Sequence, residues 1–274
     1  MRFRVPCPAK LNLSLAVGPK DACGLHQVRT VLQAVSLFDE LEIDTNAQVP
    51  EIECDWPDLP AATSLTKTLS LAAEALRLPS LGIRLTKRIP PESGLGGGSS
   101  DAAGLLRFLV AQFGLDPDLA RGIAKAIGVD TAFFLIGGKA LGDGYGERLT
   151  PLPDAPPRWA VVARPDEGCP TAPAYARLDS APPRPWPPNA PTEGHNDFEA
   201  VAPEASLRLL DTLRGAGASP AGLTGSGSAV YGFLSSEREA TEMKASIDPI
   251  APHRCWLVRT LDRAECLAIE RLDP

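Results

Sequence analysis

The glycine-rich segment Gly94–Ser100 is the feature that most constrains how this chain can fold. Four glycines fall within the five positions from Gly94 to Gly98. A strand pattern at Leu81–Ile89 precedes them, and a helical pattern at Ser99–Phe113 follows. Because glycines lack Cβ atoms, several backbone N–H groups can turn toward one point. The start of the helix adds free N–H groups and the positive end of its dipole, so the segment predicts a phosphate-binding loop.

A flexible turn with a serine cap is the simpler interpretation of such a stretch, but its place between strand and helix favours the phosphate site. Two other phosphate motifs do not fit. The chain has no GxxxxGK[ST] sequence. A dinucleotide fingerprint needs an acid at the end of a strand about 20 residues after its glycines. Asp116 has that spacing from Gly94, but it precedes Pro117 between two expected helices.

Composition narrows the class of protein. The chain has 274 residues, of which 44% are hydrophobic, so it has enough apolar side chains for a core. Its formal net charge of -7 argues against nonspecific nucleic-acid binding, which depends on Lys and Arg. The chain has no run of about 18 apolar residues, so we expect no membrane span. We therefore expect a cytoplasmic protein with no nucleic-acid or membrane partner. We also expect a monomer or weak homodimer.

The cysteines and histidines do not indicate a metal site. The six cysteines form no CxxC pair, and the three histidines are scattered. We expect reduced and mostly buried thiols.

The remaining periodicity predicts an α+β fold in two parts. A proline-dense stretch at Pro151–Pro157 suggests a boundary, which gives domains 1–152 and 153–274. The expected strands are Arg2–Cys7, Leu11–Val17, Asp39–Asp44, Leu81–Ile89, Trp159–Arg164, Ser228–Leu234 and Arg254–Thr260. The expected helices are Ser64–Leu78 with Ser64 as its cap, Ser99–Phe113, Asp116–Ile127, Phe198–Leu213 and Glu237–Ser246.

Three motifs occur in order along the chain: Pro8–Leu13, Gly94–Ala103 and Leu223–Ala229. Together they resemble the GHMP kinase superfamily, and the similarity runs over nearly the whole chain. The resemblance implies an N-terminal domain like the second domain of ribosomal protein S5. It also implies a ferredoxin-like C-terminal α/β sandwich, with the active site in the cleft between the two.

The resemblance implies a kinase that uses ATP with Mg²⁺ and transfers phosphate to a small alcohol. Lys10 and Asp130 match the catalytic pair, in which the Asp accepts the proton of the substrate hydroxyl. Asn12 lies two residues beyond Lys10, on the same strand face, and with Asp130 it is expected to bind the substrate. Ser99 and Ser100 could offer hydroxyls to phosphate or Mg²⁺. The expected ATP-binding residues are Pro90, Pro91, Glu92, Ser93, Gly94, Leu95, Gly96, Gly97, Gly98, Ser99, Ser100 and Gly225.

Within the superfamily, the sequence is most similar to kinases that phosphorylate the 2-hydroxyl of a cytidine diphosphate-linked methylerythritol in non-mevalonate isoprenoid biosynthesis. The resemblance makes His26 a reader of the cytosine ring, with Leu25 and Tyr175 beside it. Leu25 departs from the family, in which a Tyr is usual. It therefore leaves open a GHMP-type kinase with a different alcohol substrate. A nucleotide-binding protein without catalysis is the third possibility, against which the intact Lys10 and Asp130 speak.

Overall fold

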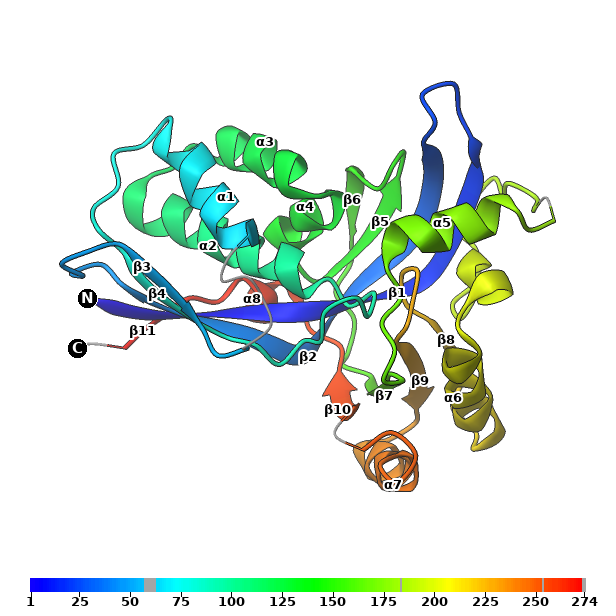
Figure 1. Ribbon diagram of the computed structural model, residues 1–274. Coiled ribbons are helices and arrows are strands. Elements are labelled where there is room, and N and C mark those ends of the chain that lie inside the picture. Colours follow the sequence, from blue (N-terminus) through cyan, green and yellow to red (C-terminus); the bar gives the residue numbers. More distant parts are fainter. Residues whose placement is uncertain (57–62, 183, 253, 273–274) are drawn as a thin grey trace.

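The computed structural model describes residues 1–56, 63–182, 184–252 and 254–272, and it contains two sheets, each covered by helices on one face (Figure 1). The larger sheet has the strand order β11-β1-β2-β4-β3, and β5 extends it by pairing with β2 and with β6. Its strands are β1 (Arg2–Lys20), β2 (His26–Asp44), β3 (Glu51–Cys54), β4 (Gly82–Thr86), β5 (Lys139–Asp143), β6 (Arg148–Leu152) and β11 (Glu270–Arg271).

The first two strands are longer than the sequence predicted. Arg2–Cys7 and Leu11–Val17 are parts of the continuous strand β1, and Asp39–Asp44 is the end of β2. The prolines at positions 6 and 8 do not break β1. From Val5 onward its outer side is not paired with β11, which contacts only Phe3 and Arg4, and an edge tolerates residues without an N–H group.

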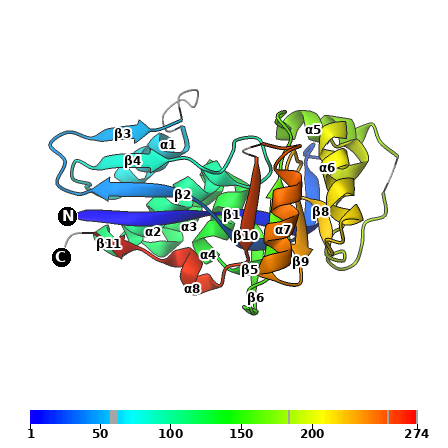
Figure 2. The same cartoon turned by 90° about the horizontal axis from the view of Figure 1, so that it is seen from below.

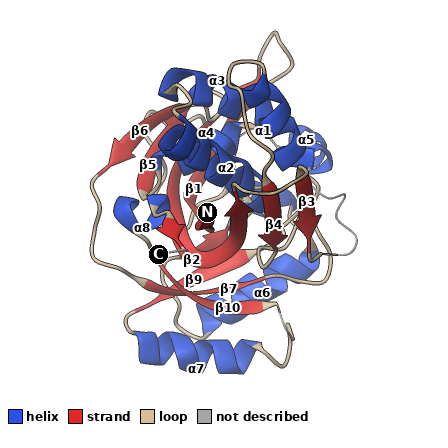
Figure 3. Ribbon diagram, turned by 90° about the vertical axis from the view of Figure 1, so that its left-hand side faces the viewer, coloured by secondary structure: helices blue, strands red, loops and turns tan. Residues whose placement is uncertain are grey.

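Helices α1 (Thr63–Ala73), α2 (Gly97–Phe113), α3 (Pro117–Ile127) and α4 (Val129–Ile136) cover one face of the larger sheet (Figure 3). Helix α3 begins as expected, because the Asp116 carboxylate accepts hydrogen bonds from Asp118 N and Leu119 N. Helix α1 already includes Thr63, so Ser64 lies inside its first turn and is not the predicted cap. The sequence did not predict α4, whose residues follow α3 after a single glycine.

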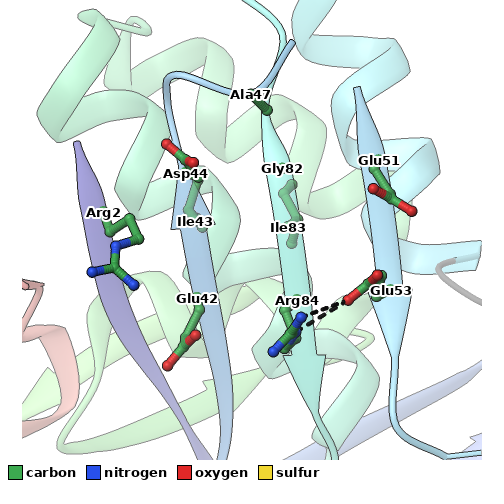
Figure 4. Close-up of a pocket in the computed structure, with 10 residues that line it drawn as sticks. All are labelled: Arg2, Glu42, Ile43, Asp44, Ala47, Glu51, Glu53, Gly82, Ile83 and Arg84. Carbon is green, nitrogen blue, oxygen red and sulfur yellow. Dashed lines mark hydrogen bonds and ion pairs between the residues drawn. The ribbon is translucent and has the colours of Figure 1, made fainter. Parts of the chain in front are cut away.

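The opposite face of the larger sheet is open beside β3 and β4. Side chains that alternate with the buried Ile43 and Ile83 line a charged hollow of about 330 Å³ there (Figure 4). Acidic Glu42, Asp44, Glu51 and Glu53 stand in it with Arg2 and Arg84. None of the predicted site residues lines this hollow.

The smaller sheet has the order β10-β7-β9-β8, and each of its strand pairs is antiparallel. It contains β7 (Trp159–Ala163), β8 (Ala221–Leu223), β9 (Val230–Leu234) and β10 (Cys255–Arg259), while α6 (Glu204–Gly215) and α7 (Glu237–Ile247) cover one face (Figure 2). The succession β7-α6-β8-β9-α7-β10 is the ferredoxin-like arrangement expected from the resemblance. The predicted helix Phe198–Leu213 is wrong as one element, because Pro203 separates the short helix η1 (Asp197–Val201) from α6.

The two sheets pack against each other. Ala160 and Val162 of β7 contact a cluster that includes Leu11 and Leu13 of β1, while Val161 and Ala163 face α6 and α7. Helix α5 (Thr171–Asp179) reaches over the β1–β2 hairpin, and after β10 the chain returns through α8 (Arg263–Leu267) to place β11 beside β1 (Figure 1). The residues after β10 therefore belong with the larger sheet. No helix among the described residues is long and apolar enough to cross a membrane.

Candidate active site

The glycine loop turns directly from β4 into helix α2. Gly94 and Gly96 have φ values of 77° and 78°, a left-handed conformation that glycine adopts without the strain of a Cβ atom. Helix α2 begins at Gly97, two residues earlier than predicted, and its first bond runs from Ser100 N to Gly96 O at 2.9 Å. The N–H groups of Gly97, Gly98 and Ser99 precede that bond and so point out of the helix start. This arrangement is suited to phosphate oxygens.

A cavity of about 420 Å³ lies against the loop, and Thr171 of α5 lines it from the other half of the molecule. Most of the predicted ATP-binding residues line it: Pro90, Pro91, Glu92, Ser93, Gly94, Gly96, Gly97, Gly98 and Ser99, together with Asp130. Leu95 and Ser100 are fully buried and do not line it. Of the two serines predicted to contact Mg²⁺, only Ser99 reaches the cavity.

The predicted catalytic residues come together beside the loop. Lys10 Nζ lies 3.5 Å from Asp130 Oδ2, with the lysine side chain 3% exposed and the aspartate 37% exposed. Lys10 is held from two sides, because its N–H donates to Leu95 O at 2.9 Å and its Nζ donates to Asn12 Oδ1 at 2.5 Å. A Cβ on Gly96 would lie 3.2 Å from Lys10 Cγ, so the loop packs closely on the lysine. The pair thus places one cation and one accessible carboxylate at the mouth of the phosphate-binding helix.

The third glycine motif packs onto the loop from the second half of the molecule. Thr224 Oγ1 donates to Gly94 O at 3.2 Å, and Ala229 N donates to Ser93 O at 3.0 Å. Gly225 N donates to Asn12 Oδ1 at 2.8 Å, although Gly225 does not itself line the cavity. The motif therefore connects the glycine loop to the strand that carries Lys10.

Glu92 is the acidic residue of the loop, and it lines the cavity while its carboxylate lies beside Gly168. A Cβ on Gly168 would lie 2.7 Å from Glu92 Oε2, which places the carboxylate beside that glycine. The backbone of Glu92 has φ 51°, and its carbonyl accepts from Cys169 N at 2.9 Å.

His26 and Tyr175, both predicted to bind the substrate, are stacked with ring centroids 5.2 Å apart. His26 Nδ1 lies 2.9 Å from Gly18 O, and its Nε2 lies 2.9 Å from Asp179 Oδ1 at the end of α5. Burial, and secondarily the charge of Asp130, raise the pKa of Tyr175 to about 12, so this phenol is neutral at physiological pH. Leu25 is 52% exposed at the tip of the hairpin.

A buried charge cluster beneath the loop was missed at the sequence level. Lys87 Nζ donates hydrogen bonds to the carboxyl groups of Asp39 and Asp101, the latter at 2.8 Å, and all three side chains are at most 5% exposed. Asp39 Oδ1 also accepts from Arg88 N and Ile89 N, which fixes the turn from β4 into the loop. Burial, followed by the charge of Asp39, raises the pKa of Asp101 from 3.8 to about 8.

One sequence signal could have revealed this cluster. Asp39 alternates with the buried Leu41 and Ile43, so it lies in the core-facing register of its strand, where a carboxylate needs a buried partner.

The residues that line the cavity indicate how it would hold a nucleotide with its magnesium ion. Among the described residues, no three His, Cys, Asp or Glu side chains converge as a metal site. The cradle has room, since a Cβ on Gly98 would meet nothing nearer than Ser64 Oγ at 4.0 Å. A Mg²⁺ ion would therefore be held chiefly by the nucleotide's phosphates, and Ser99, which lines the cavity, would offer it a hydroxyl. Its role there would be to neutralise charge that develops on the phosphate oxygens.

Comparison with known proteins agrees with this geometry. Residues 63–138 match the family described as GHMP kinases N terminal domain, and residues 192–249 match GHMP kinases C terminal. A homoserine kinase from Cytophaga hutchinsonii has the same fold, with a TM-score of 0.65 and 18% identity over 95% of each chain. The fold and the glycine-loop site together define a GHMP kinase.

Relatives of higher identity narrow the family further. The chain is 39% identical to 4-diphosphocytidyl-2-C-methyl-D-erythritol kinase of Solibacter usitatus (strain Ellin6076), over 96% of this chain and 90% of the relative. It is 35% identical to the enzyme of that name from Anaeromyxobacter sp. (strain Fw109-5), over 90% and 87%. A crystal structure of 4-(cytidine 5'-diphospho)-2C-methyl-D-erythritol kinase superposes with a TM-score of 0.78 at 28% identity, over 94% of this chain and 98% of that one. The chain belongs to the 4-diphosphocytidyl-2-C-methyl-D-erythritol kinase family.

Proposed function

We propose that this protein transfers the γ-phosphoryl group of MgATP to the 2-hydroxyl of 4-diphosphocytidyl-2-C-methyl-D-erythritol, a step of non-mevalonate isoprenoid biosynthesis in the cytoplasm. The observation that carries the proposal is the Lys10–Asp130 pair, 3.5 Å apart, at the mouth of the phosphate-binding helix. This pair places a base for the substrate hydroxyl next to the loop that would bind the phosphates of ATP. Membership of a kinase family gives the substrate class.

The residues divide the reaction between them. The N–H groups of Gly97, Gly98 and Ser99 hold the phosphates of ATP at the start of α2. Asp130 accepts the proton of the substrate hydroxyl while the oxygen of that hydroxyl bonds to the γ-phosphorus. The bond from that phosphorus to the β–γ bridging oxygen breaks, and ADP leaves. Lys10 lies 3.5 Å from Asp130 and stabilises the developing alkoxide.

The acceptor side is built to hold a flat ring at a distance from the reacting hydroxyl. His26 and Tyr175 lie on the hairpin and α5, and the charge of Asp130 contributes to the raised pKa of Tyr175. We propose that the cytosine ring binds against this aromatic pair, with the methylerythritol extending toward Asp130. Asn12 Nδ2 donates one N–H to Thr30, so its second N–H can serve the substrate.

A different alcohol substrate is the alternative that one observation favours. Leu25 stands exposed beside His26 and offers no aromatic face for a base. Loss of base stacking costs roughly 1–3 kcal/mol, which weakens binding without changing the chemistry. We therefore keep the cytidine-linked alcohol as the proposed substrate, and the test includes others.

The test is ADP release by the purified protein with MgATP and one acceptor at a time. We expect turnover with 4-diphosphocytidyl-2-C-methyl-D-erythritol and background rates with homoserine or mevalonate. Asp130→Asn should lower kcat by about 10²- to 10⁴-fold, the contribution typical of a general base. The control is Asp118→Asn, an exposed carboxylate paired with Arg121 on α3, which should keep wild-type kinetics. Faster turnover with another alcohol would replace the substrate, and an active Asp130→Asn would require another base.

A further inference from the structure

The side-chain amide of Asn12 connects three parts of the active site. Its Oδ1 accepts from Lys10 Nζ at 2.5 Å and from Gly225 N at 2.8 Å. Its Nδ2 donates to Thr30 Oγ1 at 2.8 Å. Asn12 is 5% exposed and Thr30 is 3% exposed, so both lie largely out of reach of solvent. The position of the Lys10 ammonium therefore depends on how this amide is oriented.

The hydroxyl of Thr30 helps to fix that orientation, together with the two donors that face Oδ1. Thr30 Oγ1 lies 2.6 Å from Ser14 O, and a carbonyl oxygen can only accept. The single proton of the hydroxyl is therefore used on Ser14 O, and Thr30 Oγ1 can only accept from Asn12. This requirement turns the NH₂ group of Asn12 toward Thr30 and leaves Oδ1 facing Lys10 and Gly225. The opposite orientation would place NH₂ against an ammonium and a backbone N–H, which are both donors.

The strands explain why Thr30 lies within reach. β1 and β2 pair with Asn12 opposite Leu32, but the register shifts so that Ser14 is opposite Val31 and Leu15 opposite Thr30. Such a shift re-aims side chains relative to a regular ladder. The hydrogen-bonded chain runs from Ser14 O through Thr30 and Asn12 to Lys10, whose Nζ is 3.5 Å from Asp130.

We propose that Thr30 is a positioning residue for phosphoryl transfer. Through the Asn12 amide it sets the position of the Lys10 ammonium relative to Asp130. The same amide oxygen accepts from Gly225 N, so it also connects Lys10 to the third glycine motif. Thr30 does not itself touch the reacting atoms. The inference rests on the proposed kinase activity and adds a residue that acts on its rate through another side chain.

The matched substitutions are Thr30→Val, which keeps the branched shape without the hydroxyl, and Thr30→Ser, which keeps the hydroxyl. Displacement of a reacting group by about 1 Å can cost about 100-fold in rate. We expect Thr30→Val to lower kcat by about 10- to 100-fold and to change the KM for ATP by less than about threefold, because the loop N–H groups are unaffected. Thr30→Ser should restore kcat to within about threefold of wild type.

Thr260→Val is the control for a merely structural effect. Thr260 is also buried, and its Oγ1 accepts from Arg158 N at 2.9 Å where the chain bridges to β2. It should lose as much thermal stability as Thr30→Val and keep wild-type kcat. The inference is overturned if Thr30→Val keeps wild-type kcat, if Thr30→Ser is as slow as Thr30→Val, or if Thr260→Val is equally slow. A wild-type protein that turns over no alcohol rejects the proposed function and this inference together, whereas an active wild type with an active Thr30→Val rejects only the inference.

Discussion

Gly94 of the glycine loop packs against the backbone of the third glycine motif, and Gly94→Ala tests that contact. A Cβ at this position would lie 2.1 Å from Thr224 O and 2.9 Å from the carbonyl carbon of the same residue. These are backbone atoms, so no side-chain rotation relieves the clash. The φ of 77° adds the strain of a left-handed conformation for a residue with a Cβ.

The two costs add to a measurable loss of stability. The left-handed conformation costs about 1–2 kcal/mol, and overpacking against rigid atoms costs about 1–3 kcal/mol. We therefore expect Gly94→Ala to destabilise the fold by about 2–5 kcal/mol, which for a chain of this size lowers Tm by roughly 3–9 °C. Gly98→Ala is the matched control in the same loop. Its Cβ would meet only Ser64 Oγ at 4.0 Å, and in the first turn of α2 alanine is a better helix former than glycine.

The assay is thermal unfolding without nucleotide, followed by circular dichroism. Gly98→Ala should melt at or above the wild-type Tm, and Gly94→Ala clearly below it. Equal melting of Gly94→Ala and wild type would refute the reasoning, because it would mean that the two glycine motifs do not pack as described.

Two further predictions concern charge and substrate. The pKa of Asp101 is raised to about 8, whereas an unfolded aspartate loses its proton near pH 4, so unfolding releases a proton between these values. The free energy of unfolding of the wild type should therefore fall as pH rises through that window, by at most about 1.4 kcal/mol per pH unit from this group. Asp101→Asn should lack this contribution, and urea unfolding at pH 6 and pH 8 measures the difference. Identical pH slopes for both proteins would contradict the raised pKa. Leu25→Tyr should lower the KM for the cytidine-linked substrate by about fivefold or more through restored stacking, while the KM for ATP stays constant in steady-state kinetics. An unchanged KM for that substrate would mean that position 25 does not face the base.

The parts of this fold that depend on local pattern were predictable. The glycine cluster and the helix after Asp116 follow from spacing or from residue type, whereas the ferredoxin-like succession was implied by the resemblance. The long strand β1 was not, because Pro6 and Pro8 read as breaks unless the strand is known to lie at an edge there. Helix α4 was missed because it follows α3 after a single glycine, with no stretch of loop residues between them.

The site was predictable where residues act in one motif and not where they meet across the fold. Lys10 and Asp130 were paired through the resemblance, and their distance of 3.5 Å required the structure. The Asp39–Lys87–Asp101 cluster joins a strand, a turn and a helix, and no local pattern reports such a meeting. The role of Thr30 was also not predictable from the sequence. It depends on a register shift between β1 and β2 and on which carbonyl oxygen accepts the hydroxyl proton of Thr30.

The most direct measurement of the central claim is ³¹P NMR of the reaction of the purified protein with MgATP and 4-diphosphocytidyl-2-C-methyl-D-erythritol. The account predicts a new phosphomonoester signal on the methylerythritol moiety, formed in equal amount to ADP and strongly reduced with Asp130→Asn. Formation of ADP without a phosphorylated alcohol, or no reaction at high protein concentration, would contradict it.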